Sequence, residues 1–259
     1  MITATLPYRV TPARVLRSEW HKLRTLRSTW ITLVATSLLT VAMGMGLAAA
    51  YDGTGEGAMD TVLFILLGTQ FATINLGVLG ILATAGEYST GQIRATMTAV
   101  PRRLPVLWSK AAVLAAIAFP FALLTNLVTF PLAQSFLTGT DQAASLGDPG
   151  VLRALAGNAA GLTLLAVLAL GIGALLRSVP MAIGAFTGLI MIVPEVLAML
   201  PYEIVDDAVR YFPGKALETL TTAQPLPGTA SPGAALLAMI LWTTVTLMLA
   251  AAVLRRRDV

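Results

Sequence analysis

Long apolar stretches recur along the whole chain and constrain its fold more than any other feature. A bilayer core of about 30 Å needs roughly 20 apolar residues per crossing helix. Only 12% of the residues are charged, whereas a soluble protein carries about a quarter, and the mean hydropathy is +0.80. The sequence therefore predicts an all-α, polytopic membrane protein, a single domain over residues 1–259 with six transmembrane helices. We expect these spans at about 30–50, 61–85, 105–134, 154–176, 179–200 and 232–254.

Several kinds of site are excluded by the residue types that the chain lacks. It contains no cysteine, and its only histidine is His21. Thiolate metal sites, thiol nucleophiles and His-rich zinc or iron sites are therefore ruled out. The pattern GxxxxGK[ST] does not occur, so the chain has no P-loop to hold ATP phosphates. We expect no enzyme activity, no cofactor bound by this chain and no nucleic-acid partner.

The placement of basic residues predicts the orientation. If the N-terminus lies inside, 14 of the 17 Lys and Arg residues fall on the inner side, and the outer side keeps only Arg153, Arg210 and Lys215. Cytoplasmic segments of membrane proteins carry such an excess of Lys and Arg. The prediction is a multi-pass protein of the bacterial plasma membrane with both termini in the cytoplasm.

Residues 11–28 have the pattern of a basic amphipathic helix that lies in the membrane interface. The apolar side chains fall within one arc of about 140° at 100° per residue, and Glu19 interrupts this face. The helix is either a lipid anchor or a mechanical part that also contacts a cytoplasmic partner. The apolar arc holds Val15, Leu16, Trp20, Leu23, Leu26 and Trp30, and the residues we expect to matter for function are Arg17, Glu19, Trp20, Lys22 and Leu23.

The polar segment 86–103 between the second and third spans has the pattern of a cytoplasmic lever. Residues 92–99 can form a short helix that Pro101 ends. A short helix that projects between two spans would move both spans when force acts on it. Arg102, Arg103 and Lys110 mark the return of the chain into the membrane.

These segments resemble a known family. The order Glu87, Gly91, Arg94, Pro101, Arg103, Lys110 strongly resembles the corresponding loop in permeases of the type-2 ATP-binding-cassette (ABC) exporter family. The segment SEWHKLRTLRSTW is similar to the interfacial connecting helix of that family. The resemblance covers the whole chain, from the interfacial helix to the long outer loop 201–231. Gln92 departs from the pattern, because members usually have Thr after the Gly.

The resemblance implies partners that the residues alone do not show. Segment 86–103 would contain the coupling helix that docks on a separate ATPase subunit, which binds ATP and magnesium, and a second permease chain would complete a homodimer or heterodimer. The segment 201–215 would form short outer helices that cap the pathway, although it also fits an ordinary interfacial loop. The residues assigned to ATPase coupling are Glu87, Gly91, Ile93, Arg94, Met97, Pro101 and Arg103, with direct contact mainly through Glu87, Ile93, Arg94 and Met97.

A few polar residues lie inside the predicted spans: Gln70, Asn75, Asn126, Gln134, Asn158 and Glu195. An ionisable residue in a span is a candidate functional residue by default, so Glu195 could line a pathway, and Asn75 near the middle of its span could do the same. Both also fit structural roles, Glu195 by reaching outer water and Asn75 by bonding a neighbouring helix.

The sequence thus predicts the membrane-spanning subunit of an ATP-driven exporter that forms the substrate pathway. Two other functions compete with this one. An ion-gradient-driven secondary transporter would need buried charges near the midplane and inverted repeats, and no clear repeat occurs. A non-transporting sensor or scaffold subunit is the other. Drugs, lipids, peptides and polysaccharides all remain compatible substrates.

Overall fold

The computed structural model describes residues 11–53, 59–93, 104–224 and 228–256. In these residues the secondary structure is helical, with no strand. Six of the described helical segments are long and apolar enough to cross a membrane. The predicted class, an all-α polytopic membrane protein, is confirmed.

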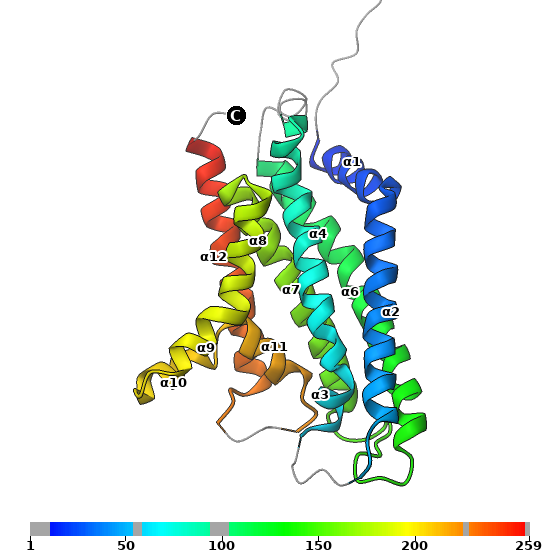
Figure 1. Ribbon diagram of the computed structural model, residues 1–259. Helices are drawn as coiled ribbons and strands as arrows, with labels where there is room; N and C mark the ends of the chain where they lie inside the picture. The colour runs from blue at the N-terminus through cyan, green and yellow to red at the C-terminus, as the bar shows by residue number, and fades with distance from the viewer. Residues whose placement is uncertain (1–10, 54–58, 94–103, 225–227, 257–259) are drawn as a thin grey trace, which may run out of the picture.

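The spans run side by side, and the short helices lie at the two ends of the bundle (Figure 1). Helix α1 and the last turn of α12 share one end, which we call the terminal end; the opposite end is the distal end. The spans are α2 (Arg27–Ala49), α3–η1–α4 (Thr61–Ile65, Leu66–Gly68, Thr69–Ser89), α6 (Leu104–Leu137), α7 (Val151–Leu176), α8–η2–α9 (Val179–Thr187, Gly188–Ile192, Val193–Ala198) and α12 (Pro232–Arg256). The short helices are α1 (Pro12–Thr25), α10 (Glu203–Val209) and α11 (Pro213–Thr221).

Helix α7 forms the centre of the bundle. Its most apolar window is 78% buried within the chain, compared with 28% for α2 and for α12. Close approach to α4 depends on glycine: a Cβ at Gly80 would lie 2.1 Å from the Ala166 carbonyl oxygen, and one at Gly173 would lie 2.5 Å from Thr84 Oγ1. Small residues let membrane helices pack backbone to backbone in this way. The α4–α7 pair is therefore a fixed frame on which the other helices pack.

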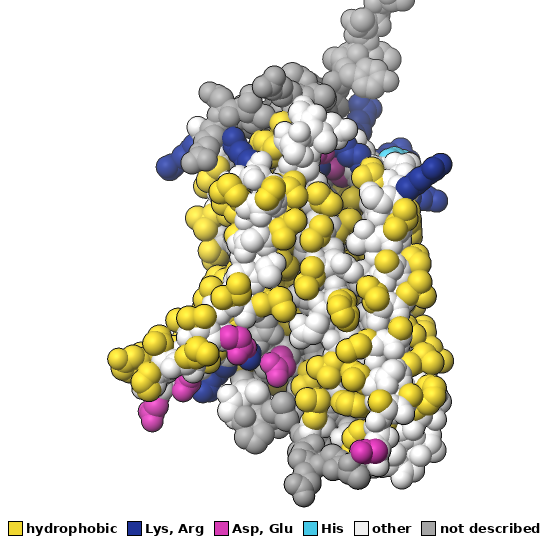
Figure 2. Space-filling model, viewed as in Figure 1, with side chains coloured by type: hydrophobic (Ala, Val, Ile, Leu, Met, Phe, Trp, Pro, Cys, Tyr) yellow, Lys and Arg dark blue, Asp and Glu magenta, His cyan; other side chains and the backbone are white. Residues whose placement is uncertain are grey.

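Charge is sorted along the bundle axis. Lys and Arg side chains gather at the terminal end, and hydrophobic side chains cover much of the length between the ends (Figure 2). Most of the visible Asp and Glu side chains lie towards the distal end. This distribution is the one that membrane insertion with an asymmetric charge bias produces.

The structure differs from the sequence prediction at the start of the chain. We predicted one interfacial helix through Ser28, but α1 ends at Thr25 and α2 begins at Arg27. Between them Leu26 is extended, with φ −71° and ψ 114°. The Trp30 indole N–H donates to the Arg24 carbonyl oxygen at 2.8 Å and fixes the corner. The break lets α1 lie across the terminal end while α2 runs along the bundle (Figure 1).

The second span is longer than predicted at its terminal end. We expected the span to stop near 85 and a loop to begin at 86, but α4 continues to Ser89. Gly91 follows with a φ of +73°, a left-handed conformation that only glycine adopts without strain. Glu87 and Tyr88 therefore belong to a rigid helix, and their side chains have fixed directions relative to α7.

The fifth span contains a widened π-helical turn, η2, followed by a proline. Pro194 has no N–H to donate to the carbonyl group of Ile190. Gly214 of α11 lies against that carbonyl group, where a Cβ would be 2.5 Å from the oxygen. Beyond η2, α9, which is the last part of the fifth candidate span, leaves the bundle sideways and forms an arm with α10 (Figure 1). The predicted outer loop 201–231 thus carries two short helices, α10 and α11.

Candidate functional site

Four charged side chains from three helices meet at the terminal end; we call them the charge cluster. Lys110 Nζ of α6 donates to Glu19 Oε2 of α1 at 2.8 Å and to Glu87 Oε1 of α4 at 2.7 Å. Lys22 Nζ of α1 donates to the same Glu87 oxygen at 2.6 Å and to Glu19 Oε1 at 3.3 Å. The cluster is formally neutral and ties α1 to both α4 and α6.

Local helix geometry brings these four residues together. Glu19 and Lys22 are three residues apart on α1, so they lie on one face of that helix. Glu87 lies in the last turn of α4, and Lys110 lies in the second turn of α6. The two helices that flank segment 90–103 therefore each supply one charge to the cluster. Any displacement of either helix end acts on α1 through ion pairs.

Burial makes this cluster energetically important. Glu19 is 4% exposed, and Glu87 and Lys110 are each 6% exposed. Removing one member of a buried ion pair leaves an uncompensated charge and typically costs about 3–5 kcal/mol. Lys22 is half-buried: burial lowers its pKa, but the hydrogen bond to Glu87 and the charges of both carboxylates outweigh that effect, so its pKa is raised. Lys22 is therefore protonated at neutral pH.

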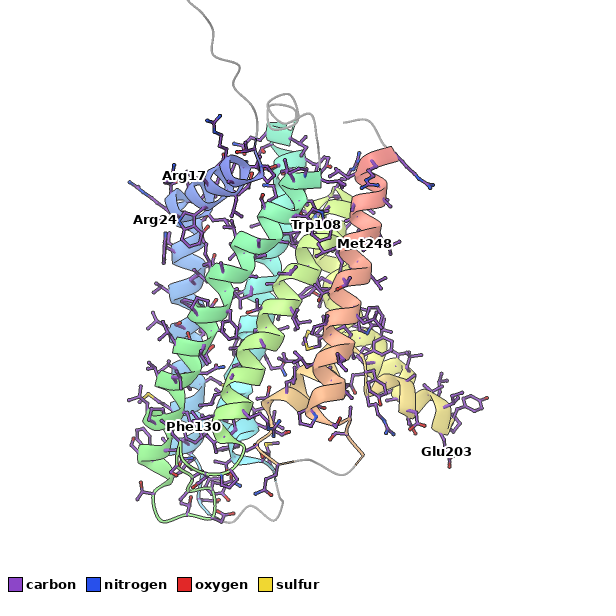
Figure 3. All side chains as sticks on the ribbon, turned by 180° about the vertical axis from the view of Figure 1, so that it is seen from behind. Arg17, Arg24, Trp108, Phe130, Glu203 and Met248 are labelled. Carbon is purple, nitrogen blue, oxygen red and sulfur yellow. The ribbon has the colours of Figure 1, made fainter. Side chains whose placement is uncertain are left out.

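The predicted residues of the interfacial helix divide between two environments. Glu19, which interrupts the apolar face in sequence, is buried with Val15 against the bundle. Trp20 is 39% exposed and Leu23 is half-buried. Arg17 is exposed, and Figure 3 shows it with Arg24 on α1 at the terminal end. Helix α1 thus has one face for the protein and a neighbouring face for the bilayer, with basic residues at its edge.

The residues assigned to ATPase coupling are only partly within the described chain. Glu87, Gly91 and Ile93 are described, whereas Arg94, Met97, Pro101 and Arg103 lie outside the described residues, as does most of the short helix expected at 92–99. Ile93 is 7% exposed, so its side chain is covered by its own chain. Glu87 is likewise buried, and its carboxylate binds two lysines of the same chain. A direct contact between Glu87 and an ATPase stays a prediction, and it would have to form beside these two ion pairs or replace them.

Sequence reasoning missed a second contact at the end of α4. The Arg177 guanidinium lies over the Tyr88 ring, 5.0 Å from its centroid, in cation–π geometry. Arg177 forms the tight turn between α7 and α8 and has a left-handed backbone, with φ 56°. Its side chain is directed by that turn towards α4. The end of α4 is therefore connected to the fourth and fifth spans as well as to α1 and α6.

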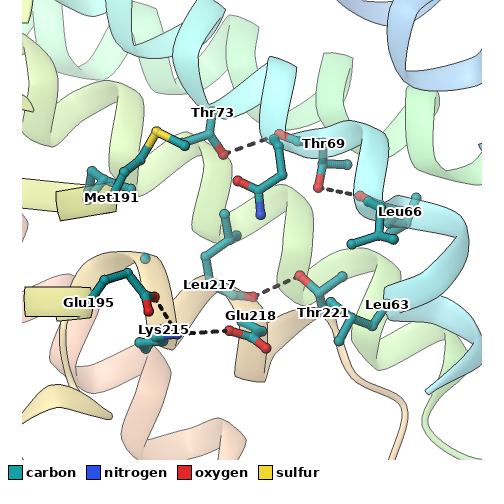
Figure 4. Close-up of a pocket in the computed structure, with 14 residues that line it drawn as sticks. Leu63, Leu66, Thr69, Thr73, Met191, Glu195, Lys215, Leu217, Glu218 and Thr221 are labelled. Atoms are coloured by element: carbon teal, nitrogen blue, oxygen red, sulfur yellow. Dashed lines mark hydrogen bonds and ion pairs between the residues drawn. The ribbon is translucent and has the colours of Figure 1, made fainter. Parts of the chain in front are cut away.

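A second group of charges lines a cavity towards the distal end, beside α11. Lys215 Nζ lies 2.7 Å from Glu195 Oε1 and 4.0 Å from Glu218 Oε2 (Figure 4). The cavity has a volume of about 300 Å³, and α4 contributes Gln70 and Thr73 to its wall. The hydrogen bond to Glu195 is the main reason that the pKa of Lys215 is raised. Charged and polar groups therefore lie together on the wall of this cavity.

The two residues proposed for a pathway separate in the structure. Glu195 lines the distal cavity, with its side chain 62% exposed. Asn75 does not line this cavity; its Nδ2 donates to Thr36 Oγ1 of α2 at 3.0 Å. Asn75 therefore joins two helices. Asn126 and Asn158, also noted in the sequence, bond each other at 3.0 Å between α6 and α7.

The role of Lys110 was the main omission from the sequence-based assignment. The sequence did indicate that Lys110 needs an ion-pair partner, because Lys110 lies inside the predicted third span, where an unpaired charge is costly. Glu19 on the apolar face of α1 carried the same signal. Among the described residues there is no group of three or more His, Cys, Asp or Glu side chains that could hold a metal ion.

Comparisons with known proteins add no assignment: no protein-family model matches the chain, and a search of curated proteins finds no match.

Proposed function

We propose that the chain is the membrane-spanning subunit of an ATP-driven exporter and that a separate ATPase acts on it at the terminal end. The observation that carries this proposal is the charge cluster, which joins α1 to the two helices on either side of segment 90–103. A protein that receives force from a partner needs such a rigid connection between its contact surface and its spans. The resemblance of this segment to the coupling loop of type-2 ABC permeases points to the same end.

In this proposal the terminal end faces the cytoplasm, as the basic residues there favour. ATP binding closes the dimer of ATPase subunits and displaces the coupling segment. Glu87 and Lys110 pass that displacement to α1 and to the second and third spans. The Tyr88–Arg177 contact passes it to the turn before the fifth span. Glu87 acts inside the permease as a connecting group, and the partner contacts the more exposed surface around it.

A second permease chain completes the pathway in this proposal. The distal cavity with Glu195, Lys215 and Gln70 then lies on the route of the substrate to the outer side. Two permeases and two ATPases would form the working unit. The chain performs no covalent chemistry itself, since energy from ATP arrives through the partner.

Site-specific cross-linking tests the proposed contact. The chain is free of cysteine, so single cysteines can be placed at Ser89 and Thr90, exposed at the end of α4, and at Thr138, exposed at the distal end of α6. The tagged chain is expressed in its native host and treated with a thiol-to-amine cross-linker of short reach. We expect Ser89→Cys or Thr90→Cys to capture a protein that contains a P-loop, identified by mass spectrometry, and Thr138→Cys to capture none.

The same cysteines test the orientation. Thr138→Cys should react with an impermeant thiol reagent in intact cells, and Ser89→Cys only after the inner face is opened. The reverse pattern would place the terminal end outside and exclude an intracellular ATPase partner. Capture of no P-loop protein from either Ser89→Cys or Thr90→Cys, with the orientation as expected, would favour a secondary transporter or a scaffold subunit.

A further inference from the structure

A cavity of about 610 Å³ lies beside the charge cluster at the terminal end. Helix α1 and the α1–α2 corner form one wall, and α4 forms the other. Leu23, Leu26, Leu79, Leu82 and Ala83 make most of this lining apolar, and Glu19, Lys22, Glu87 and Lys110 form its charged part. A cavity of this volume is of the size that holds a small amphiphilic molecule. We call it the α1–α4 cavity.

Two buried polar atoms of residues lining this cavity have no hydrogen-bond partner. One is Glu87 Oε2, and the other is Thr29 Oγ1. Glu87 is 6% exposed and Thr29 is 2% exposed. Leaving a buried acceptor or hydroxyl group unsatisfied costs about 1–3 kcal/mol. The two groups come from different helices, α4 and α2, and both residues line the cavity.

The charges of the cavity indicate a ligand that is itself neutral overall. Glu19 and Glu87 are balanced by Lys22 and Lys110. A net cation or a net anion would leave an uncompensated charge in a largely buried site, which is costly. A zwitterion avoids that cost, because its cationic group can approach Glu87 Oε2 while its anionic group approaches Lys22. Lys22 is the more exposed lysine of the cluster, with 37% of its side chain exposed, and its ammonium has a third N–H beyond the two that donate to Glu87 and Glu19.

The lining also indicates the kind of cationic group. A carboxylate oxygen needs an N–H or O–H donor to complete its hydrogen bonding. A primary ammonium supplies such donors, whereas a quaternary ammonium supplies none. Quaternary ammonium groups are recognised by aromatic cages, and none of the described residues that line the cavity is aromatic. A primary ammonium therefore fits better than a choline group.

The position of the cavity indicates that the ligand comes from the bilayer. Helix α1 forms one of its walls, and the Leu16 and Trp20 side chains of that helix are exposed. This is the level where the basic end meets the hydrophobic surface (Figure 2). A headgroup placed at the charge cluster would leave its acyl chains along Leu79 and Leu82 of α4.

We propose that the α1–α4 cavity binds a glycerophospholipid with a primary-ammonium, zwitterionic headgroup, the chemistry of phosphatidylethanolamine. The ammonium donates to Glu87 Oε2, the Thr29 hydroxyl and Lys22 donate to the phosphate, and the acyl chains pack on the leucines of α4. A lipid held here joins α1 to α4 and α2 at the base of the charge cluster. This proposal does not depend on an ATPase partner.

Native mass spectrometry of the detergent-solubilised full chain tests the proposal. The protein is delipidated and then titrated with an equimolar mixture of phosphatidylethanolamine, phosphatidylcholine and phosphatidylglycerol of identical acyl chains. We expect retained lipid to be enriched in phosphatidylethanolamine about tenfold over each of the others, which corresponds to the loss of one hydrogen bond to a charged group. Equal retention of the three lipids, preference for either other lipid, or retention of none would overturn the proposal.

Two variants locate the bound lipid. Leu82→Trp fills the cavity, and Leu38→Trp on the exposed surface of α2 is its matched control; only the first should lose the enrichment. Thr29→Val removes a hydroxyl group that has no partner in the protein, so it should not lower the thermal stability of the delipidated chain. The same change should weaken phosphatidylethanolamine binding about fivefold. Unchanged lipid binding in both Leu82→Trp and Thr29→Val would place the lipid elsewhere and refute the assignment.

Discussion

The two ends of the molecule each hold a small group of Lys and Glu side chains, and the groups differ in burial. At the terminal end, Lys110 pairs with Glu19 and Glu87, and all three are almost fully buried. At the distal cavity, Lys215 pairs with Glu195, whose side chain is 62% exposed. The shortest Lys–Glu distance within the terminal trio and the Lys215–Glu195 distance are both 2.7 Å. Geometry alone therefore does not separate a structural connection from a surface pair.

The two groups differ in what surrounds a carboxylate once its lysine partner is removed. Glu195 is largely exposed outside the protein interior, so the Lys215–Glu195 pair is not enclosed as the terminal cluster is and contributes little. Water reaches Glu19 and Glu87 poorly, so each depends on Lys110 and Lys22. The terminal cluster can transmit a displacement because breaking it is costly. The distal pair can break and rearrange at a lower cost in free energy.

The largest effect should come from Lys110. The variant Lys110→Met leaves two buried carboxylates with only Lys22 to balance them. We expect it to lower the free energy of unfolding by about 3–5 kcal/mol, measured by denaturant titration in mild detergent. A loss below about 1 kcal/mol would show that the cluster is solvated like a surface pair, and the contrast between the two ends would disappear.

A double variant separates the cost of an unpaired charge from the loss of packing. Lys110→Met combined with Glu19→Leu removes one charge of each sign and leaves the Lys22–Glu87 pair intact. Because an apolar replacement of a buried ion pair is often neutral, we expect the double variant to regain most of the stability lost in Lys110→Met. If the double variant loses as much free energy of unfolding as the two single variants lose together, packing rather than charge balance stabilises the terminal end.

Lys22 should show an intermediate effect. Its side chain is 37% exposed, so solvent screens part of the loss, and Lys22→Met should cost about 1 kcal/mol. The folded pKa of Lys22 is raised above 10.5, so its contribution is complete below that pH and is lost only as the pH rises through the folded pKa. The difference between Lys22→Met and the unmodified chain should therefore be constant through the neutral range; a difference that varies there would contradict the assigned pairing.

The smallest effect should come from the distal pair. Lys215→Met should change the free energy of unfolding by about 0.5 kcal/mol or less, because the side chains of both partners are partly exposed, 36% for Lys215 and 62% for Glu195. About 1 M salt, which shortens electrostatic range to about 3 Å, should abolish what remains of this effect while leaving that of Lys110→Met largely intact. Equal salt sensitivity of the two variants would show that the two ion-pair groups are equally accessible to solvent.

Much of the architecture could be predicted from sequence because the bilayer imposes it. Each of the six apolar stretches in the sequence coincides, to within a few residues, with one of the six candidate spans of the structure. The errors occur where neighbouring helices, rather than the bilayer, decide the outcome. Helix α4 continues to Ser89 because Glu87 and Tyr88 have partners on α6, α1 and the α7–α8 turn. The break at Leu26 follows from the packing of α1 across the terminal end.

The sequence by itself determined the class of the protein, the number of spans and the asymmetry of charge, since these depend on composition and length along one chain. It also singled out Glu19, Glu87 and Lys110 one by one, without their partnership. Only the tertiary structure decided that these three side chains meet and that Glu87 is used inside the chain. Glu19 and Lys110 are 91 residues apart in sequence, and no local periodicity encodes contact between such residues. Their pairing results from how α1 and α6 pack in three dimensions.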